Sequence, residues 1–222
     1  MKKAFPFRMR PGFTIIELIV AISVIIIITS VAVPRFNSYA ETQDFNRNLQ
    51  GLVSCIQDGR QLAAAPPAGV GLPSIRYVEV RLSPNATTAT NLDCKLVLYA
   101  PTVTMDTLVA GTATAVMWSK TPVTKTLANV QITRATPQGA AAMAVSNPSS
   151  LRIFFGTTEN GVPVLYMPCA AGLICPPTQV VRAPANPLGH GISLEMNLTN
   201  TLGDTQALTM ETLGLPIQLT AL

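Results

Sequence analysis

The residues with the most distinctive chemistry in this 222-residue chain are four cysteines and one histidine, namely Cys55, Cys94, Cys169, Cys175 and His190. An even set of cysteines is typical of disulfide bonding where a domain faces an oxidising compartment. Zinc binding is the competing interpretation, but no two cysteines have C-x-x-C spacing and the histidine has no second histidine to join it. We therefore expect disulfide bonds, no metal site and no cofactor.

The cysteine spacing favours one disulfide bond and leaves a second open. Cys169 and Cys175 have five residues between them and a proline outside each, which predicts a small disulfide-closed loop. Cys55 falls in an expected helix and Cys94 in an expected strand, so a bond between them would join helix to sheet. Free buried thiols at Cys55 and Cys94 are the alternative, because four cysteines allow three connectivities and the sequence does not choose among them.

No catalytic constellation is evident. A Ser-His-Asp or Cys-His arrangement would have to use His190, which lies in the sequence Leu188-Gly189-His190-Gly191, where flexibility suits a turn. The chain also has no phosphate-binding glycine loop. An enzyme is therefore not expected.

One carboxylate, Glu17, lies within a long apolar run. From Phe13 to Val33 the chain has 21 residues and Glu17 is the only charged one. As a helix this run would be about 30 Å long, which matches the hydrocarbon core of a bilayer. A carboxylate inside a membrane segment costs a few kcal/mol on insertion scales and usually marks function.

A short basic segment precedes the apolar run. Residues 1–12 carry four of the chain's basic residues and no acid, and Gly12 stands between these charges and the run. A secretory signal peptide has its cleavage site after the apolar region. Cleavage after Gly12 would instead remove the charges, keep the membrane helix and leave Phe13 as the new N-terminus. An ordinary one-span anchor, in which Gly12 and Glu17 have no special role, is the alternative.

Residues 8–36 resemble the class III leader of type IV pilins and type II secretion pseudopilins. The matching residues are Gly12, Phe13, Thr14, Ile16, Glu17, Leu18 and Pro34. The resemblance implies that a prepilin peptidase cuts after Gly12 and N-methylates Phe13. It also implies that Glu17 neutralises the N-terminal amine of a neighbouring subunit during filament assembly. Pro34, in this family, is expected to allow a kink or a melted stretch in the assembled fibre, whereas a simple bend at the membrane exit is the plainer interpretation.

The function implied is that of a structural subunit of a type IV pilus-like or pseudopilus filament, assembled through its hydrophobic N-terminal helix. Expected partners are copies of the chain or other pilins, the prepilin peptidase and an inner-membrane assembly platform. The subunit would lie in the inner membrane before assembly and in an extracellular or periplasmic filament afterwards. Residues 48–65 also loosely resemble the pseudopilin-H and minor-pilin group.

A DNA-binding minor pilin used in DNA uptake is the alternative function. Basic residues such as Arg134 and Arg152, expected on loops, would then contact phosphates. The balanced charge of the mature chain argues against DNA binding as the leading function. Of 15 basic residues four lie in the leader, so the mature chain has 15 − 4 = 11 basic residues against 11 acidic ones.

The expected fold is α+β, with a long N-terminal helix packed on an antiparallel β-sheet as in pilins. Residues 1–12 form the leader, 13–34 the transmembrane or filament-core helix, 35–65 an amphipathic stalk helix, and 66–222 a β-rich globular region. The stalk has an apolar stripe at helical spacing, Phe45, Leu49, Leu52, Val53, Ile56 and Ala63. Strands are expected at 74–82, 92–99, 113–118, 127–133, 151–155, 162–167, 192–198, 207–212 and 216–219, and loops at 84–91, 137–150 and 168–191.

Overall fold

The structure is a computed structural model, which describes part of the chain in two compact units. The units are Met1–Thr42 and Gln43–Leu222. The described residues are 14–66, 74–116, 124–137, 145–146, 148, 150–158, 162–169, 181–182, 194–210 and 218–221.

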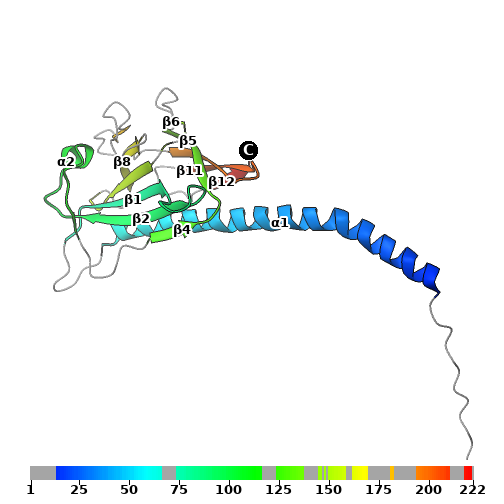
Figure 1. Ribbon diagram of the computed structural model, residues 1–222. Helices are drawn as coiled ribbons and strands as arrows, with labels where there is room; N and C mark the ends of the chain where they lie inside the picture. Colours follow the sequence, from blue (N-terminus) through cyan, green and yellow to red (C-terminus); the bar gives the residue numbers. More distant parts are fainter. Residues whose placement is uncertain are drawn as a thin grey trace, which may run out of the picture. The chain divides into compact units, whose positions relative to one another are not determined.

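A single 50-residue helix, α1 (Ile15–Ala64), opens the described chain (Figure 1). It joins the two helical segments that the sequence predicts, 13–34 and 35–65, over residues 15–64. Proline removes one backbone hydrogen bond from a helix, yet the helical conformation continues through Pro34. The helix is therefore continuous at Pro34 in this structure, and the role of this proline in a fibre stays a prediction.

Seven strands form the larger antiparallel sheet, here called sheet A. Six of them are hydrogen-bonded in the order β3-β2-β1-β7-β8-β9. The seventh, β4, also pairs with β2. The strands are β1 (Tyr77–Pro84), β2 (Leu92–Tyr99), β3 (Ala115–Val116), β4 (Thr124–Leu127), β7 (Ser150–Gly156), β8 (Val162–Cys169) and β9 (Val181–Arg182).

The remaining five strands form a second antiparallel sheet, sheet B, in the order β12-β11-β10-β5-β6. They are β5 (Gln131–Pro137), β6 (Val145–Ser146), β10 (Leu194–Thr199), β11 (Thr205–Met210) and β12 (Gln218–Ala221). The α+β class is confirmed, but the expectation of a single sheet is wrong. β6 and β9 also lie inside stretches that the sequence predicts to be loops.

The strand predicted at 127–133 is interrupted in its middle. β4 ends at Leu127 and β5 begins at Gln131, because Asn129 adopts a left-handed backbone conformation with φ 56°, which Asn tolerates better than most residues. The Asn129 N–H donates to Asn91 Oδ1 at 3.1 Å, and Asn129 Oδ1 accepts from the Thr201 N–H at 2.9 Å. This turn carries the chain from sheet A to sheet B.

A short helix, α2 (Met105–Val109), is absent from the sequence prediction. Thr104 caps it by accepting from the Thr107 N–H, and the Thr107 hydroxyl accepts from the Thr104 N–H in return. Five residues are too few to show a helical period, so the reciprocal threonine cap was the only local signal.

The main core lies between the second part of α1 and both sheets. Phe45, Leu49, Leu52, Ile56 and Ala63 of the predicted stripe are fully buried. They share one apolar cluster with residues of β1, β7, β10 and β11, and the cyan part of α1 runs along β1 and β2 in Figure 1. Two side-chain hydrogen bonds add to this packing, from Asn48 to the Ala128 carbonyl and from Gln206 to Asn46. The stripe prediction is confirmed, except that Val53 is only half-buried.

Sheet A also carries a second apolar layer on its other face. Tyr77, Tyr99, Phe154 and Leu165 pack there with Leu108 of α2. Since side chains alternate between the two faces of a strand, Tyr77 lies opposite Val78, which belongs to the main core. We call the face that carries Tyr77 the outer face of sheet A.

At Gly59, α1 lies close against sheet A. A Cβ atom at Gly59 would clash with Val80 Cγ2 and lie 3.1 Å from Leu96 Cδ2. The χ1 angle of a valine is restricted to few rotamers, so the Val80 side chain cannot move away without an energetic cost. We expect Gly59→Ala to lower the free energy of unfolding by about 1–3 kcal/mol, the usual cost of overpacking. Chemical denaturation of the full chain in detergent, followed by circular dichroism, measures this.

Gly51 provides a matched control two turns earlier on α1. A Cβ there would meet the ends of two flexible side chains, Leu127 Cδ2 at 3.0 Å and Lys125 Cε at 3.2 Å. Alanine also favours the helix over glycine by about 1 kcal/mol, so Gly51→Ala should change stability little. An equal decrease in the free energy of unfolding for Gly51→Ala and Gly59→Ala would contradict the close approach at Gly59.

Candidate functional site

Glu17 lies in the first turn of α1, where it forms reciprocal hydrogen bonds with Thr14. Its Oε2 accepts from the Thr14 N–H at 3.1 Å and from the Thr14 hydroxyl at 3.0 Å, while Thr14 Oγ1 accepts from the Glu17 N–H at 3.3 Å. This is a capping box, in which two of the helix's free N–H groups find partners. The Glu17 carboxylate therefore has a hydrogen-bonding partner within its own chain.

The role of Thr14 as the cap was not part of the sequence interpretation, although its signal was present. A threonine followed three residues later by glutamate, before an apolar run, is the pattern of a capping box. Gly12 and Phe13 lie outside the described residues. The chain order nevertheless places the amine that cleavage after Gly12 would create one residue before Thr14.

The first part of α1 exposes a large apolar surface. Large apolar side chains such as Ile15, Leu18 and Ile22 are 79%, 56% and 48% exposed. The helix contains an 18-residue window of mean hydropathy 2.8, which makes it long and apolar enough to cross a membrane. Soluble monomers rarely expose a contiguous apolar area of this kind, and such areas mark contact with a membrane or another protein.

One disulfide bond joins Cys55 of α1 to Cys94 of β2, across 39 positions of sequence. Of the two alternatives that the sequence leaves open for these cysteines, the structure has the bond and not the free thiols. It ties the helix to sheet A beside the main core. Cys169 is also disulfide-bonded, whereas Cys175 and His190 lie outside the described residues. The Cys169–Cys175 pairing stays a prediction.

A charged cluster lies on the outer face of sheet A, around the fully buried carboxylate of Glu79. Arg81 and Arg152 each donate twice to this carboxylate, from Nε to Oε1 at 2.7 Å and from Nη2 to Oε2 at 3.1 Å. The Tyr99 hydroxyl donates to Oε2 at 2.6 Å. Arg81 and Arg152 are cross-strand partners on β1 and β7, so two guanidinium groups flank one carboxylate.

The ionisable groups of this cluster keep their ordinary charge states at neutral pH. Burial alone would raise the pKa of the Glu79 carboxyl, but the hydrogen bonds and charges of Arg152 and Arg81 outweigh burial and lower this pKa below its ordinary value. Burial and the nearby Glu79 carboxylate raise the pKa of Tyr99 to about 12. At neutral pH the cluster therefore contains one anion, two cations and a neutral phenol.

The two arginines proposed from sequence as loop residues for DNA lie on strands. Arg152 is on β7 and is held by Glu79, while Arg134 is exposed on β5 of sheet B. Arg152 falls within the strand that the sequence pattern predicts at 151–155, so only the DNA-binding hypothesis assigned it to a loop. Arg134 lies just beyond the strand predicted at 127–133, and the observed strand β5 continues past it to Pro137. The structure places them in different sheets.

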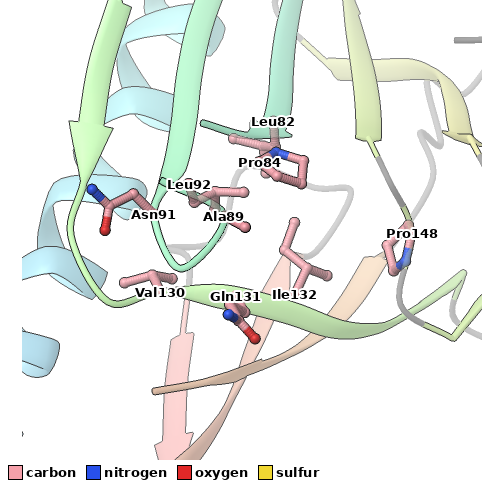
Figure 2. Close-up of a pocket in the computed structure, with 9 residues that line it drawn as sticks. All are labelled: Leu82, Pro84, Ala89, Asn91, Leu92, Val130, Gln131, Ile132 and Pro148. Carbon is pink, nitrogen blue, oxygen red and sulfur yellow. The ribbon is translucent and has the colours of Figure 1, made fainter. Parts of the chain in front are cut away.

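A pocket of about 250 Å³ lies between the β1–β2 loop and the start of β5. Figure 2 shows Ile132 of β5 beneath Pro84 and Leu92 across this space. The remaining lining residues are Leu82, Ala89, Asn91, Val130, Gln131 and Pro148. None of these nine residues is charged, so the pocket offers no group for acid–base chemistry.

Comparison with known proteins does not place the chain in a family. No protein-family model, no curated protein and no solved structure matches it significantly.

Proposed function

We propose that the chain is a structural subunit of a filament of the type IV pilus or type II secretion pseudopilus kind. The observation that carries the proposal is the contrast along α1. Its first part exposes apolar side chains such as Ile15 and Ile22, while its second part is buried against two sheets and tied to one of them by the Cys55–Cys94 bond. One helix thus joins an apolar assembly or membrane segment to a folded unit.

Glu17 supports the same function. In the unassembled subunit its carboxylate is held by Thr14. On assembly it would exchange this partner for the N-terminal amine of the neighbouring subunit, which neutralises both charges in an apolar surrounding. Before assembly the apolar segment would lie in the inner membrane, and afterwards in the filament core.

DNA capture by a minor pilin is the weaker alternative. Arg134 and Arg152 lie in different sheets, and two of the N–H donors of Arg152 are already used by Glu79. The filament role does not depend on DNA.

Processing of the leader provides the test. When the chain is coexpressed with a prepilin peptidase, we expect it to lose residues 1–12 and to begin at an N-methylated Phe13, as intact mass and N-terminal sequencing would show. Gly12→Leu should block the cut because it puts a bulky side chain beside the bond to be cleaved. Pro11→Ala, at the neighbouring position, should leave cleavage unchanged. Retention of Met1 in the wild-type chain would argue against a prepilin.

A further inference from the structure

We propose that the outer face of sheet A carries a binding site for a phosphate group, formed by Lys95, Arg81, Arg152 and Ser150. The inference does not rest on the filament role.

Three cations form one cross-strand row at this site. The pairing registers join Lys95 of β2 to Arg81 of β1, and Arg81 to Arg152 of β7. These three side chains therefore project from the same face of sheet A. All three residues are partly exposed, and the side chains of Arg81 and Arg152 are 30% and 12% exposed.

The acids on this face do not use up the donors of the row. Glu79 accepts only the Nε–H and one Nη2–H of each arginine, and the Tyr99 hydroxyl accepts from Arg152 Nη2 at 3.3 Å. The Nη1–H groups of both arginines are used by neither Glu79 nor Tyr99. Among the described residues of β1, β2 and β7 on this face, Asp93, two positions from Lys95, is the other acid, and its carboxylate accepts from Asn85 and Thr126. On these three strands, three cations face two carboxylates, which leaves one positive charge.

The buried hydroxyl of Ser150 is a second, independent indication that a ligand binds on this face. It lies two positions before Arg152 on the same face of β7 and is only 5% exposed. Its hydroxyl has no hydrogen-bond partner among the described residues, which is uncommon for a buried polar group. A ligand on this face would provide the acceptor.

The donors come from three neighbouring strands, which favours a ligand with several acceptor oxygens. A carboxylate has two oxygens, whereas a phosphate group has three or four and carries up to two negative charges. Arginine forks and a lysine ammonium are the usual phosphate ligands in proteins. Free phosphate and the backbone of a nucleic acid share this chemistry, so the experiment must separate them.

The test uses the full-length ¹⁵N-labelled chain in a non-ionic detergent. Inorganic phosphate and a short DNA duplex are titrated in separate arms, and backbone amide shifts are recorded. We expect phosphate to move the amides of Arg81, Lys95 and Arg152 with millimolar affinity. Shifts with phosphate alone identify a small-ion site, and shifts of the same amides with both probes identify nucleic acid as a second source. Unmoved amides at these three positions in both arms would overturn the proposal.

Three variants separate binding from folding. Lys95→Gln and Ser150→Ala should each weaken phosphate binding by about threefold to tenfold. Ser150→Ala should at the same time leave the melting temperature unchanged or raise it, because it removes an unsatisfied buried group. Arg134→Gln removes the same charge as Lys95→Gln but in sheet B, and should leave phosphate binding unchanged. Equal weakening by Arg134→Gln would show general charge attraction and would also overturn the site.

Discussion

Glu17→Ala is expected to abolish the incorporation of this subunit into filaments while leaving its membrane insertion and cleavage intact. The substitution makes the apolar run more apolar, so insertion does not depend on the carboxylate. Assembly would then bury the amine of a neighbouring subunit without its counter-charge. Removing one partner of a buried ion pair typically costs about 3–5 kcal/mol, which is several powers of ten in the equilibrium for each added subunit. The measurement compares the sheared surface fraction with the membrane fraction in the protein's own host.

Two further variants separate the charge of Glu17 from its role as a helix cap. Glu17→Gln removes the charge, but glutamine can still complete a capping box with Thr14. Thr14→Ala removes the cap at a cost of about 0.5–2 kcal/mol and keeps the charge. We expect Glu17→Gln to fail in assembly as Glu17→Ala does, and Thr14→Ala to assemble. The opposite pattern would mean that Glu17 acts by capping α1 and not through an ion pair between subunits.

Glu79→Gln should be strongly destabilising. It leaves the guanidinium groups of Arg81 and Arg152 facing each other without the carboxylate that both contact. We expect the free energy of unfolding at neutral pH to fall by about 3–5 kcal/mol. Glu195→Gln, which removes an exposed carboxylate on β10 of sheet B, should change stability by less than about 0.5 kcal/mol.

The pH dependence of this loss has a definite sign. The pKa of the Glu79 carboxyl is lower in the folded chain than its ordinary value of 4.5, so its stabilising contribution is fully present above that value. It is lost as the pH falls through 4.5 toward the lower folded pKa. The difference in stability between wild type and Glu79→Gln should therefore be constant from pH 6 to 8 and shrink below about pH 4.5. Denaturation at a series of pH values measures it, and a difference that grows in acid would contradict the assigned charges.

Local sequence patterns predict the helices and strands whose structure is determined within one short segment of the chain. The apolar run and the stripe that contains Leu49 and Ile56 predict α1, because both are visible within a few turns of one helix. The same holds for β2, whose observed bounds Leu92–Tyr99 equal the predicted ones. The β4–β5 break at Asn129 was missed because its cause, a left-handed residue bonded to Asn91 and Thr201, involves distant parts of the chain.

The charged cluster could not be predicted for the same reason. Within β1, the alternation of Glu79 and Arg81 with apolar residues predicts a solvent-exposed face. Glu79 is buried because α2 and Phe154 add a second apolar layer on that face, and its partner Arg152 comes from 73 positions away. Likewise, the spacing of the cysteines did not decide whether Cys55 and Cys94 pair, since their approach depends on how α1 packs on β2.

The most direct test of the filament assignment is the composition of the filaments themselves. Surface filaments sheared from the native host are purified, and the N-terminal peptide of this chain is sequenced by mass spectrometry. We expect the chain to be present in the filaments, to begin at an N-methylated Phe13, and to be absent from the sheared fraction of cells that lack the prepilin peptidase. A chain found only in the membrane fraction with Met1 retained would contradict it.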